Sequence, residues 1–323
     1  MAMIDKYKSW KPNKPSSLGA NMYHEAVVNT SWYNNNLKKL VEIVKIKINK
    51  DSIIVDFGAG TGISALFLLQ HLKQKFNMFL VDNSPSWLSK AYEILKDRSR
   101  LDFFILEKKD KNYATLADTI GENKADMVIS ANTIHLIPNL EITFKGIYNA
   151  LKHKGYFIMQ SGNILRKKRD HDTLMIDQTV EEVHELALNI IRKNKDFIKY
   201  SNGLEKRIKE EEKQRKLIFP EPRSVNHYKT TLKQVGFKRI KIETKLIKVK
   251  YHDWLNFLTI KRIQAGILPE IGGRTPTIEQ EKDRHKLIIL AIKQLFKNIK
   301  KNNHLASNNN FLAEWIYITA YKN

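Results

Sequence analysis

The sequence predicts an α/β fold in which a doubly wound parallel sheet carries helical insertions. Between residue 52 and about residue 160, short apolar runs alternate with stretches of helical character, which is typical of strand–helix–strand units. Each apolar run is almost continuous, as expected of strands that are covered on both faces. The first run leads directly into a glycine-rich loop, and doubly wound folds bind ligands beside such loops.

The first half of the chain supplies five expected strands with helices between them. The strands are expected at Ile53–Phe57, Met78–Val81, Phe103–Leu106, Met127–Ser130 and Tyr156–Gln160. The helices between them are expected at Ile63–Lys73, Ser86–Leu95, Tyr113–Ile120 and Leu140–Leu151. Two further helices, around Met22–Tyr33 and Leu37–Ile48, are expected before the first strand.

The alternation breaks after residue 162, where helical and highly charged stretches follow. A helix at His227–Val235, a strand at Phe237–Val249 and a final strand at Phe311–Tyr321 are expected later in the chain. We therefore predict an N-terminal helical flap at 1–50, a cofactor-binding core at 51–162 and a helical lid insertion at 163–226. The core continues at 227–249, a second helical insertion follows at 250–309, and a core strand at 310–323 ends the chain.

Composition excludes several classes of protein. The chain has 323 residues, 42% of them hydrophobic, which is enough apolar material for a sizeable core. It has no cysteine, so a disulfide scaffold, a zinc–thiolate site and a cysteine nucleophile are excluded. No metal site is expected. No apolar run approaches the roughly 18 residues of a membrane span, and we expect a cytoplasmic protein with no membrane partner.

The net charge is +22, from 56 basic and 34 acidic residues. Such a field attracts nucleic acids and acidic protein surfaces. The basic residues are spread along the chain with acids among them, which favours a compositional bias over a nucleic-acid footprint.

A strand, a glycine loop and an acid-ended second strand form the most informative pattern. The first strand ends with Asp56 and Phe57 and runs straight into the loop Gly58-Ala59-Gly60-Thr61-Gly62, and Asp82 ends the second strand. Glycines let the backbone approach a ligand closely, and an acid at that distance can accept both hydroxyls of a ribose. A dinucleotide-binding fingerprint would need Gly at position 63, and a P-loop would need Lys there, directly after Gly62. Position 63 is Ile, so neither fingerprint is present.

These residues resemble motif I and the ribose-binding acid of class I S-adenosylmethionine-dependent methyltransferases, small-molecule type. The stretches Ala125–Leu136, Leu151–Phe157 and Leu232–Phe237 resemble the family's later strands and turns. The match covers roughly 50–162, 227–249 and 310–322. It implies a Rossmann-like, mostly parallel seven-stranded sheet, and S-adenosyl-L-methionine as the cofactor.

The resemblance also assigns site residues. It implies that Gly58, Ala59 and Gly60 pack against the methionine part of the cofactor, and that Asp56 orients the loop and the cofactor's amino group. Asp82 would bind the ribose. The remaining cofactor-binding residues that it implies are Gly62 in the loop, Asn83, Ser84, Asp110 and Lys111 around the adenine, Ser130, Ala131 and Asn132 on the sulfonium side, and Tyr23 in the flap.

A hydroxyl acceptor must lose a proton, and His135 is the candidate base. It lies just beyond the fourth strand, and imidazole titrates near neutrality. A loop histidine bonded to the backbone is an equal alternative. His171 is a second candidate, although a solvated turn is favoured there, and His184 is interpreted as a packing residue.

The expected function is O-methylation of a hydroxyl or carboxyl on a small-molecule, polyketide-like secondary metabolite. An acceptor bound to an acidic acyl carrier protein would suit the basic charge. The Ser130-Ala131-Asn132-Thr133 run disfavours adenine- or glutamine-directed amino methylation. The alternative is an RNA methyltransferase that uses the basic surface, and a binding module with a degenerate site is a third possibility that the intact loop disfavours.

Overall fold

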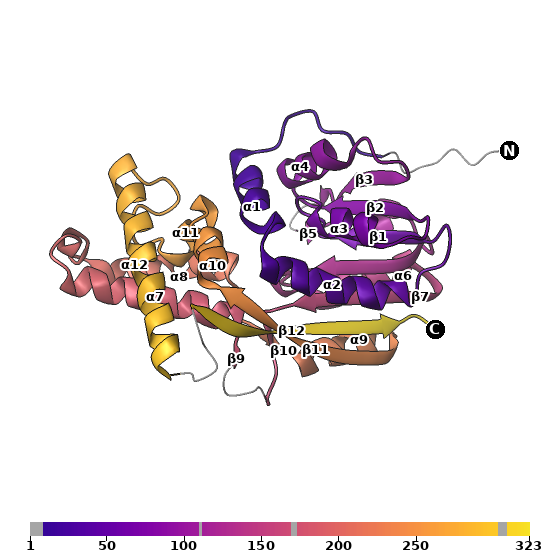
Figure 1. Cartoon of the computed structure of the whole chain (residues 1–323). Helices are drawn as coiled ribbons and strands as arrows, with labels where there is room; N and C mark the ends of the chain where they lie inside the picture. The colour runs from indigo at the N-terminus through magenta and orange to yellow at the C-terminus, as the bar shows by residue number, and fades with distance from the viewer. Residues whose placement is uncertain (1–8, 110–111, 169–172, 303–308) are drawn as a thin grey trace.

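The computed structural model describes residues 9–109, 112–168, 173–302 and 309–323. Its centre is one twisted sheet with helices on both faces (Figure 1). In spatial order the main strands are β11 (Lys238–Lys250), β12 (Asn310–Tyr321), β7 (Leu151–Ser161), β6 (Ala125–Ala131), β1 (Ile53–Phe57), β2 (Asn77–Asp82) and β3 (Leu101–Ile105). The predicted doubly wound, mostly parallel sheet is confirmed.

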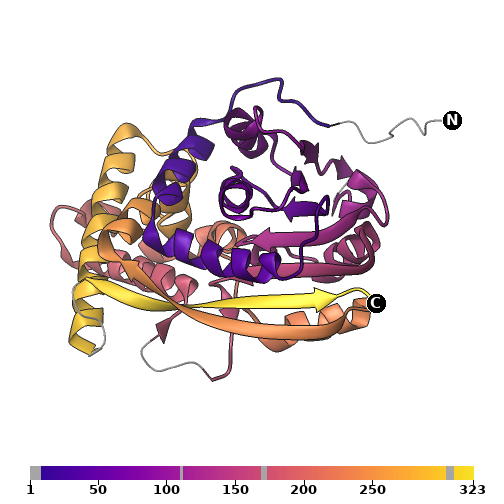
Figure 2. The ribbon, with the colours of Figure 1, turned by 45° about the vertical axis from the view of Figure 1, so that its right-hand side comes forward.

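The sheet is parallel from β7 to β3, and β12 runs antiparallel to both β7 and β11. The short strand β9 (Thr173–Leu174) pairs with β12 and brings the sheet to eight strands instead of the seven expected. Figure 2 shows β11 and β12 as a long twisted pair that extends beyond the parallel strands. Two small sheets pair β8 (Ile164–Leu165) with β10 (Arg223–Ser224), and β4 (Lys108–Lys109) with β5 (Asn112–Tyr113).

Helices cover both faces of the sheet, which explains the almost continuous apolar runs of the strands. In β1, Ile54 faces the core under α2 (Ser31–Lys45) and α3 (Ile63–His71), whereas Val55 faces the core under α6 (Leu140–Ala150). The other helices beside the sheet are α1 (Leu18–Val28), α4 (Pro85–Leu95), α5 (Leu116–Ile120) and α9 (Val225–Val235).

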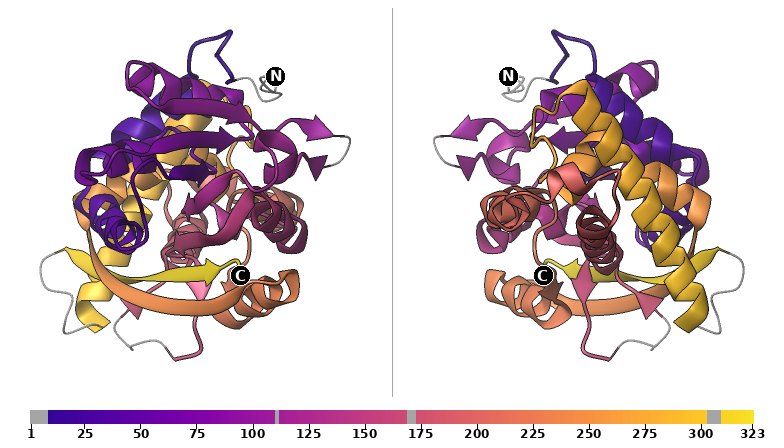
Figure 3. Two further views of the ribbon diagram at one scale, coloured as in Figure 1. Left: turned by 90° about the vertical axis from the view of Figure 1, so that its right-hand side faces the viewer. Right: turned by 90° about the vertical axis from the view of Figure 1, so that its left-hand side faces the viewer.

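The late insertions form a helical layer at the carboxyl ends of the parallel strands (Figure 1, Figure 3). They contain α7 (Ile176–Lys193), α8 (Leu204–Ile218), α10 (Tyr251–Leu258), α11 (Lys261–Ile267) and α12 (Ile278–Asn302). The long helix α12 packs along α7, and α11 packs on α7 and α8. The two 3-10 turns are η1 (Ile134–Leu136) and η2 (Ile198–Tyr200). Across the described residues, no helix has the length and apolar character that crossing a membrane requires.

Two predicted helix boundaries are wrong, and local hydrogen bonds accompany both breaks. The first helix ends at Val28; the Thr30 hydroxyl donates to the Val27 carbonyl, and the extended backbone of Thr30 separates this helix from α2. Trp32 and Tyr33 therefore belong to the second helix. The helix expected from Tyr113 begins only at Leu116, since Thr115 and Asp118 form a capping box.

Candidate active site

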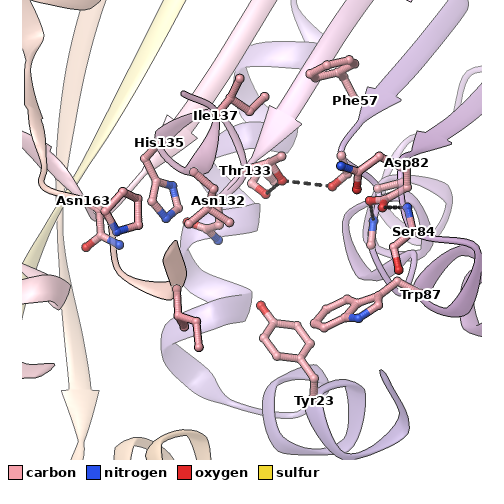
Figure 4. A pocket seen from close by; sticks show the side chains of 18 of the residues that line it. Tyr23, Phe57, Asp82, Ser84, Trp87, Asn132, Thr133, His135, Ile137 and Asn163 are labelled. Carbon is pink, nitrogen blue, oxygen red and sulfur yellow. Dashed lines mark hydrogen bonds between the residues drawn. The ribbon is translucent and has the colours of Figure 1, made fainter. Parts of the chain in front are cut away.

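A cavity of about 680 Å³ lies at the carboxyl ends of the parallel strands and reaches under the helical insertions. We call its two parts the loop end, with Gly58, Gly60, Asp82, Ser84 and Trp87, and the lid end, with His135, Asn163 and Asp177. Figure 4 shows Asp82, Ser84 and Trp87 on one side, His135 and Asn163 on the other, and Asn132 and Thr133 between them.

The glycine loop has the backbone conformation that its sequence predicts. Gly58 and Gly60 have φ values of 75° and 55°, a region that other residues rarely adopt. A Cβ on Gly58 would lie 2.1 Å from a methyl carbon of Thr133, whose hydroxyl donates to the Gly58 carbonyl at 3.0 Å. Ala59 also lines the cavity. The loop is thus held against the segment after β6.

Gly62 has a different task from the other two glycines of the loop. It caps the start of α3 with φ 77°, and a Cβ there would meet Ala91 of α4 at 2.9 Å. It is not among the residues that line the cavity. Its small size therefore allows α3 and α4 to pack closely, and it does not face a ligand.

Asp82 ties the glycine loop to the start of α4. Its Oδ2 accepts from the backbone N–H of Gly60 and its Oδ1 from that of Ser84, both at 2.8 Å. Burial raises the pKa of Asp82, and the backbone hydrogen bonds oppose that shift. The side chain lines the cavity together with Asn83 and Ser84, so a carboxylate is presented where the second strand ends.

Asp56 lies behind the loop and not in the cavity. It is fully buried, and its Oδ2 accepts from the Ser64 hydroxyl at 2.6 Å. Burial raises the pKa of Asp56 to about 7. Its Oδ1 has no hydrogen-bond partner among the described residues. Asp56 therefore holds the first turn of α3, just after the loop, and it is not among the residues that line the cavity.

The segment after β6 contributes differently from the expectation. Ser130 does not line the cavity, which corrects its expected place on the sulfonium side. Its hydroxyl is fully buried and donates to the carbonyl of Phe57 at 2.8 Å, because alternate residues of a strand face opposite sides. Ala131 and Asn132 do line the cavity. Asn132 has φ 53° and accepts from the indole N–H of Trp315 at 3.1 Å.

His135 occupies the lid end, 9% exposed and lining the cavity. Burial, with a smaller contribution from the charge of Arg223, lowers the pKa of His135 to about 4. The imidazole is therefore neutral near pH 7 and able to accept a hydrogen bond or a proton. Its Nδ1 lies 3.1 Å from the Ser161 hydroxyl, so the partner is a side chain and not the backbone.

The lid end is one connected hydrogen-bond network. Ser161 Oγ accepts from the Asn163 backbone N–H at 2.9 Å, and Asn163 Oδ1 accepts from the Asp177 backbone N–H at 3.0 Å. The network links η1, the end of β7 and the first turn of α7. It places two polar side chains, Asn163 and Asp177, beside His135 in the same cavity.

A row of aromatic rings lines the cavity. Tyr23 of α1 lies 4.8 Å from Trp87 and 6.2 Å from Phe257, measured between ring centroids. Trp32 continues the row at 5.7 Å from both Phe257 and Trp315. All five line the cavity. Burial raises the pKa of Tyr23, so its hydroxyl stays protonated.

Sequence reasoning missed Trp87, Thr133, Asn163 and Asp177. An aromatic residue in the first turn after the acid-ended strand was an available signal for Trp87. No sequence signal pointed to the lid-end residues Asn163 and Asp177, since their segments meet only in the folded chain. Asp110, Lys111 and His171 lie outside the described residues. His184 is buried, 3.0 Å from Glu270 Oε1, and does not line the cavity.

The loop end fits a bound S-adenosylmethionine. The glycines leave the backbone open at the end of β1, the Asp82 carboxylate faces the cavity, and the Trp87 and Tyr23 rings offer flat apolar surfaces. A doubly wound sheet with an antiparallel strand β12 and this site define a nucleoside-binding enzyme of the kind the sequence resembles.

The comparisons with known proteins identify the family. Residues 48–243 match the family model described as a methyltransferase domain, which is more than half of the chain. The chain therefore belongs to this family, and the resemblance to class I S-adenosylmethionine-dependent methyltransferases is confirmed. It is an enzyme of that class, with S-adenosyl-L-methionine as its methyl donor.

Individual relatives cover only part of the chain. It is 28% identical over 126 residues to a highly reducing polyketide synthase of Aspergillus terreus, covering 39% of this chain and 5% of the synthase. It is 29% identical over 150 residues to the carboxy-S-adenosyl-L-methionine synthase of Nautilia profundicola, covering 45% of this chain and 59% of that protein. The chain thus spans less than two thirds of these relatives.

A solved structure shares the fold. Phosphoethanolamine N-methyltransferase 2 of Haemonchus contortus, in complex with S-adenosyl-L-methionine, superposes with a TM-score of 0.50 at 17% identity. The alignment covers 94% of this chain and 56% of that one.

Proposed function

We propose that this enzyme methylates a hydroxyl or carboxyl of a small, largely apolar acceptor of the polyketide type. The cavity carries this proposal, because one continuous space extends from the glycine loop to the lid end, where aromatic side chains and several polar side chains line it together. Such a compartment suits a compact apolar molecule with a hydrogen-bonding group. The partial similarity to polyketide synthases supports the same acceptor class.

The cofactor is assigned to the loop end. Gly58, Ala59 and Gly60 would hold its methionine part, Asp82 its ribose, and Asn83 and Ser84 would lie near the adenine. When bound, the cofactor supplies an activated methyl group on a sulfonium. The protein then contributes alignment of the acceptor and exclusion of water.

His135 is assigned to the acceptor hydroxyl. Because its pKa is lowered to about 4, the ring accepts a hydrogen bond throughout the neutral pH range. If Ser161 accepts the Nδ1 proton, the free lone pair is on Nε2. A base of such low pKa is a weak one, so its main contribution is to orient the hydroxyl and to receive its proton as the methyl group is transferred.

A methyl-transfer assay tests the proposal. The protein is incubated with methyl-labelled S-adenosylmethionine and, separately, with phenols, carboxylic acids, amines and total RNA, and Asp82→Ala serves as the control that should lose cofactor binding. We expect label on oxygen of apolar phenols or acids. Label on amines alone would refute O-methylation. An RNA methyltransferase, the alternative that the charge of +22 supports, would label RNA and bind it with a steep salt dependence.

An acceptor tethered to an acidic carrier protein is compatible with the same charge. In that case, transfer to a carrier-bound acyl chain should exceed transfer to the free acid at low salt. The advantage should disappear at high salt, since exposed charges are then screened. Equal rates of methyl transfer to the carrier-bound acyl chain and to the free acid at low salt would indicate that the enzyme acts on free small molecules.

A further inference from the structure

Asp177 is a buried acid that the protein leaves unpaired inside the cavity. It occupies the first turn of α7, is 7% exposed and lines the cavity. Its backbone is fixed, since the N–H donates to Asn163. Its carboxyl Oδ2, in contrast, has no hydrogen-bond partner among the described residues.

The surroundings of Asp177 make such an unpaired oxygen costly. Burial raises the pKa of Asp177 to about 7, and the charge of Glu181 on the same helix adds to the shift. Neither cause is a cation. Nearby, a Cβ on Gly162 would meet Ile176 at 2.8 Å and Trp315 at 3.0 Å, so the space beside Asn163 is tightly apolar. A buried acceptor without a donor is unfavourable. This oxygen is closed off from the cavity as the side chain stands, so a ligand that supplies a donor would remove the cost once the carboxyl turns Oδ2 toward the cavity.

The missing donor is better explained as a neutral hydroxyl than as a cation. The sulfonium of the cofactor belongs in the same cavity, and the charge of Arg223 already lowers the pKa of His135. A second cation in this cavity would be repelled by both charges, which offsets part of its attraction to the Asp177 carboxylate. A hydroxyl brings a donor without a charge.

We propose that Asp177 recognises the acceptor by accepting a hydrogen bond from a second hydroxyl group, one that is not methylated. This inference rests on the proposed function, in which His135 takes the reacting hydroxyl. The network from His135 through Ser161 and Asn163 to Asp177 then holds two acceptor-binding side chains in fixed relation. The enzyme would therefore select dihydroxylated over monohydroxylated apolar acceptors.

Calorimetric binding to the protein saturated with S-adenosylhomocysteine tests this without any methyl transfer. The probes are 2-naphthol and a set of dihydroxynaphthalene isomers that differ in the spacing of the two hydroxyls. Above pH 8, where an Asp177 carboxyl with a pKa of about 7 is ionised, we expect at least one isomer to bind about ten-fold tighter than 2-naphthol, as a hydrogen bond to a charged group allows. Asp177→Leu should abolish that gain, so that the isomer and 2-naphthol bind this variant with similar affinity.

Asp177→Asn is the matched variant, because its amide oxygen still accepts a hydrogen bond, and it should retain a gain of a few-fold. Unchanged S-adenosylhomocysteine affinity shows that a variant is folded. If Asp177→Leu is not folded by this measure, Asp177→Asn alone tests whether Asp177 recognises the second hydroxyl. No gain for any isomer, or a full gain in Asp177→Leu, would overturn the inference.

An aminomethyl-2-naphthol that binds more tightly than every diol would overturn the assignment to a hydroxyl. The binding result is also separable from the proposed function. Failure to methylate the naphthols would refute O-methylation of these probes while leaving hydroxyl recognition by Asp177 measurable.

Discussion

The loop end and the lid end of the cavity are built in opposite ways. The loop end comes from one continuous stretch of strand, loop and strand, and its carboxylate Asp82 is satisfied by two backbone amides. The lid end joins η1, β7 and α7, and within the described residues an oxygen of Asp177 has no hydrogen-bond partner. A site that binds one fixed cofactor can be completed by the protein itself, whereas a site for a variable acceptor leaves hydrogen-bonding capacity to the ligand.

The largest expected effect is a loss of cofactor affinity when the backbone conformation of the glycine loop, at the loop end, is disturbed. Gly58→Ala places a Cβ 2.1 Å from Thr133 at a φ of 75°, so the loop must shift. We expect cofactor affinity to fall by roughly 3 kcal/mol, or more than a hundred-fold, from strain and displaced contacts. Gly60→Ala is the control, because it carries a similar backbone strain at a φ of 55° but no clash, since its nearest neighbour lies at 3.4 Å; it should therefore cost less. Equal calorimetric losses in both variants would contradict this account of the loop.

The next effect belongs to the lid end. His135→Ala should lower kcat about a hundred-fold, at the low end of general acid–base contributions because the pKa of the ring is only about 4. Cofactor affinity should not change. The wild-type pH–rate profile should show no histidine ionisation between pH 6 and 8. Unchanged turnover in His135→Ala would place the proton acceptor elsewhere.

Asp82→Ala returns to the loop end. It removes a carboxylate that holds the Gly60 and Ser84 amides and is assigned to the ribose. Cofactor affinity should fall by about 2 kcal/mol, the scale of lost charge-assisted hydrogen bonds. Dihydroxynaphthalene binding at the lid end should be spared once the cofactor site is saturated. Unchanged cofactor affinity by calorimetry would remove the ribose assignment.

The smallest effect concerns stability and applies to Asp56. Its pKa is raised to about 7 in the folded protein, above the unfolded value near 4. The folded state therefore holds the proton more tightly, and this stabilisation, complete below pH 4, is lost as the pH rises through 7. Between pH 6.5 and 8, thermal or urea unfolding of the wild type should lose about 1 kcal/mol more than Asp56→Asn. Identical pH slopes would show that Asp56 is ionised when folded.

The loop end was predictable from the sequence because its parts are local. The strand before Asp56, the glycines and Asp82 lie within about 30 residues of one another, and parallel strands bring their carboxyl ends to one edge. Apolar periodicity likewise identified the strands. The predicted position of the Ser130 side chain was wrong, because neighbouring residues of a strand face opposite sides and packing decides which side each one takes.

The lid end was decided by the tertiary structure. Asn163, Asp177 and Trp315 are separated from His135 by up to 180 residues of chain, and no local pattern in the sequence specifies that they meet. The unpaired state of Asp177 depends on what the folded chain buries around it. The sequence by itself thus determined the fold class and where the glycine loop lies, because these follow from short-range patterning. Which polar groups line the lid end of the cavity was set only when distant segments packed together.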